Sequence, residues 1–241
     1  MLHAIVQNKT KMHERYLSRK HEDDIKGRRT QEDEITSIVF SPLEILPSKI
    51  SGKLWHDLLK SKKANLPESQ IVGSSHCFWP RVKDSNGKPL EPDLVVTLNY
   101  DTGEKKFIII EFKWNSPLSN KASEDEQRNQ LQIQWKDFKF EDGSNANYHI
   151  FIGKETSEAL KAKSTNDVWG GCLITFSWFE LLGAIKSLVQ QPSNKDLKNW
   201  SDLICKFMSK LGIQPFNGFE SFTPTLLPQA QQSEYVFWSN Q

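Results

Sequence analysis

The sequence predicts an α/β fold: a central mixed β-sheet, made of an antiparallel hairpin plus parallel strands and flanked by helices. The hairpin is predicted at 93–113, where two apolar runs flank the turn sequence DTG at 101–103. The parallel strands are predicted at 147–153 and 170–178, two apolar runs separated by a short helical segment near 155–163. A strand, a crossover helix and a second strand in this order are typical of a parallel pair.

The segment before the hairpin contains mainly helical signals. Residues 3–26 predict a polar, weakly amphipathic helix. A second helix is predicted to begin with Thr30 as its cap and to end at Pro42, because proline cannot continue a helix. A third helix is predicted with Ser51 as its cap. Apolar residues between 70 and 82 then indicate one or two short strands.

Helices also follow the hairpin. A strong helix is predicted over 123–140, where Leu131 and Trp135 recur at helical spacing. Two closing helices are predicted between 178 and 213. The chain is therefore expected to have three parts: an N-terminal helical extension (1–29), one α/β domain (30–212) and a C-terminal extension or partner-binding tail (213–241).

The composition restricts the function classes. The net charge over 241 residues is only +1, so a nucleic-acid partner would need a local basic patch rather than overall positive charge. Cys77, Cys172 and Cys205 form neither a zinc-binding spacing nor a disulfide framework, which favours a reducing compartment. The first residues contain no long apolar run, so neither a signal peptide nor a membrane anchor is expected. We therefore expect a cytoplasmic protein with no membrane partner.

Three charged residues stand on the predicted hairpin strands: Asp93, Glu111 and Lys113. If Gly103 takes the left-handed conformation that closes a three-residue turn, Asp93 falls directly opposite Glu111. Side chains alternate between the faces of a strand, so Lys113 shares the face of Glu111. A slip of one residue would move Asp93 to the other face, so this prediction depends on the register.

Two opposed carboxylates repel each other and lose hydration when buried, so they are expected to persist with a cation between them. Asp93 and Glu111 could bind Mg²⁺, with the carbonyl of Phe112 as a further ligand. Lys113 could position or deprotonate an attacking water, or stabilise charge developing on phosphorus. The alternative is an exposed salt bridge at a strand end. The apolar run FIII at 107–110 favours a buried central strand, and with it a functional site.

These residues resemble the motif of the PD-(D/E)xK nuclease superfamily, which has the restriction-endonuclease-like fold. Pro92-Asp93 is the PD, and Glu111-Phe112-Lys113 is the E-x-K. The resemblance covers roughly 30–180 and marks 30–212 as a nuclease-like domain. It implies metal-dependent hydrolysis of DNA phosphodiester bonds, with Mg²⁺ or Mn²⁺ as the cofactor.

In this superfamily a helix before the hairpin often carries a further acid. Glu32 lies on the same helical stripe as Ile35 and Val39, so it is the candidate both for catalysis and for metal binding. Glu34 is the fallback, and Asp33 is expected to be solvated or capping. The alternative for Glu32 is an acid that the helix dipole favours near a helix N-terminus.

Some branches of the superfamily, including RecB-like nucleases, place a glutamine on the helix after the lysine strand. Gln127, Gln130 and Gln134 lie along one side of the predicted helix. Gln130 is the candidate for touching the site or the scissile phosphate. The tyrosine that often follows in the RecB-like pattern is absent, since Gln134 stands in its place. An ordinary polar helix face is the alternative.

The leading expectation is an Mg²⁺-dependent endodeoxyribonuclease, the nuclease component of a defence, restriction or mobile-element system. The sequence contains no recognisable ATPase or separate DNA-reading module, so a targeting or ATPase partner protein is expected. A homodimer would let two copies cut both strands. Two alternatives remain open: a catalytically inactive nucleic-acid-binding or scaffold subunit on the same fold, and a structural α/β protein whose hairpin acids only pair with Lys113.

Overall fold

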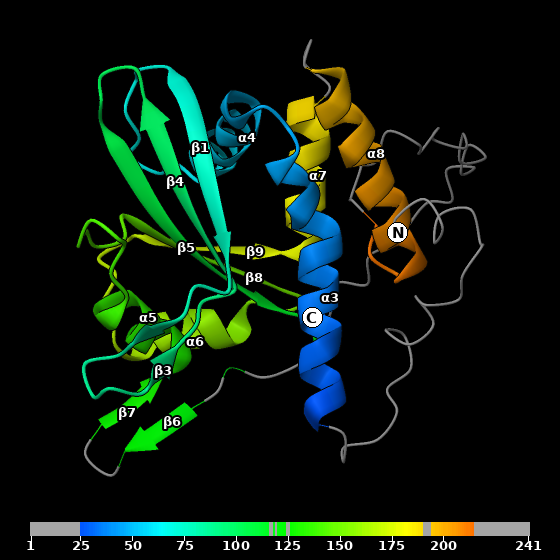
Figure 1. Cartoon of the computed structure of the whole chain (residues 1–241). Helices are drawn as coiled ribbons and strands as arrows, with labels where there is room; N and C mark the ends of the chain where they lie inside the picture. Colours follow the sequence, from blue (N-terminus) through cyan, green and yellow to red (C-terminus); the bar gives the residue numbers. More distant parts are fainter. Residues whose placement is uncertain (1–24, 116–117, 119, 124–125, 190–193, 215–241) are drawn as a thin grey trace, which may run out of the picture.

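A mixed sheet of five strands organises the part of the chain that the computed structural model describes (Figure 1). Its order is β1-β4-β5-β8-β9. β1 and β5 each run antiparallel to β4, whereas β5, β8 and β9 run parallel to one another. The predicted α/β class, with a hairpin extended by parallel strands, is confirmed. The strands are β1 (Ile71–Phe78), β4 (Leu94–Tyr100), β5 (Lys105–Lys113), β8 (Tyr148–Gly153) and β9 (Leu173–Ser177).

The structure describes residues 25–115, 118, 120–123, 126–189 and 194–214, with the backbone alone at 25–31, 120–123 and 126–128. The helix predicted at 3–26 and the tail predicted at 213–241 fall almost wholly outside these residues. Within them, no helix combines the length and the apolar character that crossing a membrane requires.

The hairpin register follows from its turn. Gly103 has a φ of +82°, the left-handed conformation that glycine adopts readily. Leu94 lies opposite Ile110, as predicted. The next pair in the same register is Asp93 and Glu111, so the two carboxylates approach each other at the end of the hairpin remote from the turn.

One face of the sheet carries the larger core. Ile110 and Phe112 of β5 point into it and are fully buried, together with Trp55 and Ile204 from two of the covering helices. Burying a side chain of this size contributes about 1.5–3 kcal/mol to folding. The helices on this face are α3 (Ile25–Phe40), α4 (Ser48–Ser61), α7 (Trp178–Val189) and α8 (Lys195–Lys210).

The other face of the sheet is covered by α5 (Gln130–Asp137) and α6 (Ser157–Thr165). Ile109 of β5 packs with Ile133 of α5. Phe151 of β8 packs with Ala159 of α6. Alternation along β5 therefore places Glu111 and Lys113 on the α5 side, while Phe112 faces the larger core. Two short antiparallel pairs lie outside the main sheet, β2 (Val82–Lys83) with β3 (Pro89–Leu90) and β6 (Asn120–Ser123) with β7 (Glu126–Asn129).

The helix predicted to begin at Thr30 begins earlier. α3 starts at Ile25, so Thr30 lies inside the helix and is not its cap. The helix ends at Phe40, and Pro42 follows in a short 3₁₀ helix, η1 (Ser41–Glu44), which agrees with the predicted end.

Ser51 is likewise inside α4 and not at its cap, because the helix begins at Ser48 after Pro47. The Ser51 hydroxyl lies 2.9 Å from Ser74 Oγ on β1. This side of the helix packs against the sheet, so the Ser51 hydroxyl makes a tertiary contact and does not cap the helix.

The prediction of a helix over 123–140 is wrong for the first part of that range. That segment forms strands β6 and β7, and Gln127 lies on β7 rather than on a helix face. α5 begins at Gln130 because Asn129 caps it: the Asn129 side chain accepts from Gln132 N at 3.0 Å, and Gln132 Oε1 accepts from Asn129 N at 3.3 Å. This reciprocal pair satisfies backbone donors that a longer helix would have bonded internally.

Candidate active site

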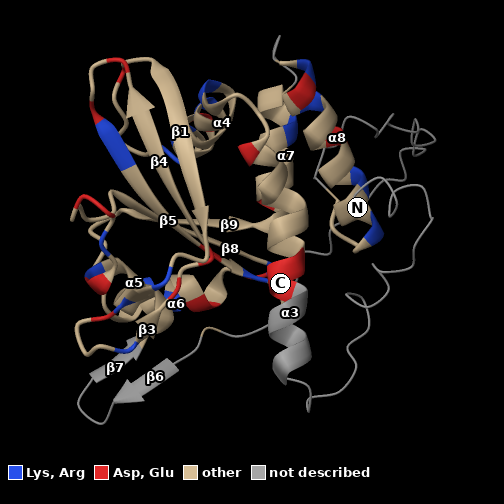
Figure 2. Cartoon of the chain, in the orientation of Figure 1, with Lys and Arg blue, Asp and Glu red and all other residues tan. Residues whose placement is uncertain are grey.

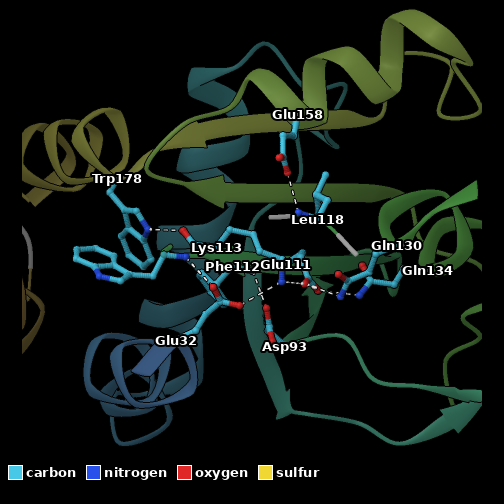
Figure 3. Close-up of polar contacts among 11 residues, drawn as sticks. Glu32, Asp93, Glu111, Phe112, Lys113, Leu118, Gln130, Gln134, Glu158 and Trp178 are labelled. Carbon is cyan, nitrogen blue, oxygen red and sulfur yellow. Dashed lines mark hydrogen bonds and ion pairs between the residues drawn. The ribbon is translucent and has the colours of Figure 1, made fainter. Parts of the chain in front are cut away.

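The side chains selected from the sequence lie together where β5 ends, close to α3 (Figure 3). Hydrogen bonds and ion pairs connect the side chains of Glu32, Lys113, Glu111 and Gln130, and the Asp93 carboxylate accepts from the backbone beside them. The structure brings these residues together, and their chemical roles stay predictions. They are Glu32 from α3, Asp93 just before β4, Glu111 and Lys113 from β5, and Gln130 from α5.

Lys113 is the positive centre of this cluster. Its Nζ lies 2.5 Å from Glu111 Oε1 and 3.2 Å from Glu32 Oε1. Only 13% of the side chain is exposed, so water screens these ion pairs weakly. Burial alone would lower the pKa of Lys113, but the Glu111, Glu32 and Asp93 carboxylates together raise it above its usual value. Lys113 is therefore an ammonium at neutral pH.

Glu32 faces the sheet from α3 and is buried. Its Oε2 accepts a hydrogen bond from Trp114 N at 2.8 Å, while its other oxygen pairs with the lysine. Because α3 begins at Ile25, Glu32 is not in the first turn, and the helix dipole does not explain its place. Of the neighbouring acids, Asp33 is exposed and Glu34 is half-buried.

Glu111 is buried, and both of its oxygens accept hydrogen bonds. Gln130 Nε2 donates to Oε1 at 2.6 Å, and Gln134 Nε2 donates to Oε2 at 2.7 Å. Burial raises the pKa of Glu111, although the Lys113 charge and the Gln134 hydrogen bond act in the opposite direction. The two glutamines and the lysine thus stabilise a carboxylate that would otherwise be costly to bury.

Gln134 is a site residue that the sequence reasoning did not select. It is fully buried, and its Oε1 has no hydrogen-bond partner in the part of the chain that is described. Residues four apart share a helix face, so the spacing from Gln130 was the signal that could have found it.

Asp93 is half-buried, and its Oδ2 accepts a hydrogen bond from Phe112 N at 2.7 Å. Burial raises the pKa of Asp93 well above its usual value, and the Glu111 charge raises it further. The Phe112 ring is buried in the larger core on the opposite face of the sheet. The proposed role of the Phe112 carbonyl as a metal ligand stays a prediction.

The charges of this cluster do not balance. Three carboxylates, those of Glu32, Asp93 and Glu111, surround the single ammonium of Lys113. Excess negative charge is unfavourable where the dielectric constant is low. A bound proton or a bound cation would relieve it, and the raised pKa values of Asp93 and Glu111 express the same tendency.

The cluster contains oxygen atoms of the type that a hard divalent cation takes as ligands. Among the described residues, no group of three or more His, Cys, Asp or Glu side chains is arranged to hold a metal ion. Carboxylate oxygens of Asp93 and Glu111, with a backbone carbonyl, are nevertheless the ligand type that Mg²⁺ and Mn²⁺ prefer. Glu111 Oε1 accepts from both Lys113 and Gln130, whereas Oε2, within the described part of the chain, accepts from Gln134 alone and keeps a lone pair that a cation could use.

Hydrogen bonds connect Lys113, at the end of β5, with α7, and Leu118, after the strand, with α6. Trp178 Nε1 donates to the Lys113 carbonyl at 3.2 Å. Leu118 N donates to Glu158 Oε2 at 2.7 Å (Figure 3). Lys154 Nζ lies 4.1 Å from the centre of the Trp114 ring. These contacts fix the position of the backbone near Lys113.

Comparisons with known proteins assign no family to this chain. No protein-family model matches it, and no curated protein or solved structure matches it.

Proposed function

We propose that this chain is a metal-dependent nuclease, an endodeoxyribonuclease that hydrolyses DNA phosphodiester bonds with Mg²⁺ or Mn²⁺ on a restriction-endonuclease-like fold. One observation carries the proposal. Asp93, Glu111 and Lys113 meet Glu32 in a buried cluster with more carboxylates than its ammonium can neutralise. A salt bridge with a purely structural role would need only one carboxylate to pair with Lys113.

The proposed metal ligands are Asp93, Glu111 and the Phe112 carbonyl, with Glu32 as a further acid. When bound, the ion would polarise a phosphoryl oxygen and lower the pKa of a water molecule. Gln130 and Gln134 would keep the Glu111 carboxylate oriented, because each already donates to one of its oxygens. Gln130 is also the residue proposed to contact the scissile phosphate.

Lys113 is proposed to act as a positive charge rather than as a base. Deprotonating water would require the neutral amine, and the surrounding carboxylates raise the pKa of Lys113 above its usual value. The ammonium would instead position the attacking water and stabilise negative charge that develops on the phosphoryl group.

The biological setting proposed is a defence, restriction or mobile-element system, in which a targeting or ATPase partner directs the nuclease to DNA. A homodimer would place one site against each strand. The support for both statements is the resemblance of the residue pattern to the nuclease motif.

The proposal is tested by plasmid nicking with Mg²⁺, Mn²⁺ or EDTA, in the wild type, Lys113→Ala and Lys105→Ala. Lys105 is an exposed lysine at the other end of β5, so it is a matched control. Metal-dependent nicking should fall at least about 100-fold in Lys113→Ala and stay within about twofold in Lys105→Ala. Full activity in Lys113→Ala, or nicking that EDTA does not affect, would remove the proposal.

A non-catalytic nucleic-acid-binding subunit is the second candidate, because Lys113 already neutralises Glu111 at 2.5 Å. This candidate predicts DNA binding without metal-dependent cleavage. Calorimetric titration with Mn²⁺ separates the two: metal binding that is lost in Asp93→Ala supports the nuclease, and absence of metal binding supports the subunit.

A further inference from the structure

A second candidate binding site lies where α4 meets the beginning of β1. A cavity of about 310 Å³ opens there, lined by residues of α4 and by residues 69–71. Ile71 lies opposite Tyr100, whereas Phe78, at the other end of β1, lies opposite Leu94. At about 3.3 Å per residue, the cavity is thus on the order of 20 Å along the strand from the candidate active site.

Basic side chains surround this cavity. Lys49, Lys53, His56 and Lys60 recur at helical spacing along one face of α4, and each lines it. Lys53 is neutralised by Asp57 at 2.6 Å. Lys49 and Lys60 are exposed and have no ion-pair partner within the described ranges. Figure 2 shows basic residues on α4, away from the carboxylates where β5 approaches α3.

One residue that lines the cavity, Ser69, has a buried polar atom without a partner. Ser69 Oγ is shielded from solvent, and none of the described residues makes a hydrogen bond with it. Buried hydroxyl groups are normally bonded, and a rotation of the Ser69 side chain toward the cavity would give this one a ligand atom as its partner. His56 and Ile71 supply less polar walls, and His56 is held by a hydrogen bond of 3.0 Å between its Nδ1 and Tyr100 Oη.

The two walls of the cavity are held in a fixed relation by tight packing. A Cβ atom at Gly52 of α4 would lie 2.8 Å from Ile71 Cγ2, so only glycine permits this close approach. On the same side of the helix, Ser74 Oγ donates to Ser48 O at 2.9 Å. A site that is formed before binding loses less entropy when a ligand enters.

We propose that this cavity binds a phosphate-bearing ligand of mononucleotide size. The ammonium groups of Lys49 and Lys60 would neutralise the phosphate, and the Ser69 hydroxyl, once rotated toward the cavity, would donate to one of its oxygens. Ile71 and the His56 ring would contact the less polar part of the ligand. The volume lies at the lower end of the range for small-molecule sites, which suits one nucleotide. A free mononucleotide and the phosphorylated end of a nucleic-acid strand present the same chemistry.

Calorimetric titration of the full chain in EDTA tests this site apart from metal-dependent activity. The probes are 5′-AMP, adenosine, inorganic phosphate and a 12-mer DNA oligonucleotide with either a 5′-phosphate or a 5′-hydroxyl. We expect 5′-AMP to bind at one site, and adenosine to bind at least about 10-fold more weakly. Oligonucleotide binding that requires the 5′-phosphate and is tighter than that of 5′-AMP would identify a strand end. Otherwise the ligand is the free nucleotide.

The variants locate the binding. Lys49→Gln combined with Lys60→Gln should weaken 5′-AMP binding at least about 10-fold, and Ser69→Ala about threefold or more. Both lysines are exposed, so the double variant is expected to fold, and its circular dichroism verifies this. Lys195→Gln, at an exposed position on α8, should leave the affinity unchanged. Equal binding of adenosine and 5′-AMP, or unchanged affinity in the double variant, would overturn the proposal.

Discussion

β5 carries a lysine at each end, and the fold surrounds the two differently. Lys105 begins the strand beside the turn and is exposed, whereas Lys113 ends it between Glu32 and Glu111 with 13% of its side chain exposed. The same residue type is a solvated charge at one end and the centre of a buried cluster at the other. The comparison teaches that the candidate chemistry depends on the acid from α3 and the amides from α5, which meet the strand at the Lys113 end.

The largest expected difference between the two ends is in stability without metal. Lys113→Met leaves buried carboxylates without their cation and should lower the free energy of unfolding by about 3–5 kcal/mol. Lys105→Met should change it by less than about 0.5 kcal/mol. Urea unfolding at pH 7.5 in EDTA measures both. Equal losses in the two variants would mean that the cluster has no special electrostatic importance.

The next difference is in the response to metal. If Mg²⁺ binds the native state alone, a concentration 100 times its Kd should add about 2.7 kcal/mol to the free energy of unfolding. Glu111→Gln should abolish this gain, while Glu104→Gln, beside the turn, should retain it. Thermal unfolding with and without Mg²⁺ provides the measurement. An undiminished gain in Glu111→Gln would place the ion elsewhere on the protein.

A smaller effect is expected from substituting Gln134, the site residue that was not selected from the sequence. Gln134→Met removes the donor to Glu111 Oε2 and should cost about 2 kcal/mol, because that oxygen is buried. Gln70→Met, at an exposed position, is the control and should be nearly neutral. Chemical unfolding of both variants at neutral pH tests this. A neutral Gln134→Met would show that Gln130 and Lys113 suffice for Glu111.

The smallest expected effect has the opposite sign and depends on pH. The pKa of Asp93 is raised in the native state, so the native state takes up a proton at higher pH than the unfolded chain does. Ionised Asp93 therefore destabilises the protein above that raised pKa. The penalty shrinks as the pH falls below this pKa and is gone below the pKa of the unfolded chain.

Asp93→Asn should consequently raise the free energy of unfolding by about 1 kcal/mol at pH 8, with a gain that shrinks toward acidic pH, while nicking is lost. Asp101→Asn, in the turn, should change it by less than about 0.5 kcal/mol. Unfolding curves collected between pH 5 and pH 8 compare the two. A gain that grows as the pH falls would contradict the assigned direction of the pKa shift.

The sequence by itself determined the central hairpin and the parallel strands of the main sheet, and the position of the candidate site at the end of β5. Turn chemistry at Gly103 sets the hairpin register, and the two-residue period then brings Asp93 opposite Glu111 with Lys113 on the same face. The stripe shared with Ile35 placed Glu32 toward the sheet. Each of these inferences depends on residues that are near one another in the chain or directly paired across a hairpin. Such relations can be read from a local sequence pattern.

Tertiary structure alone decided which groups surround the acids. The start of α5 at Asn129, the approach of Gln134 to Glu111, and the excess of carboxylates around Lys113 depend on how helices are placed against the sheet. Beside the cavity, Gly52 likewise allows α4 and β1 to meet closely. Helix placement results from packing summed over many distant side chains, so the spacing within one segment does not contain it.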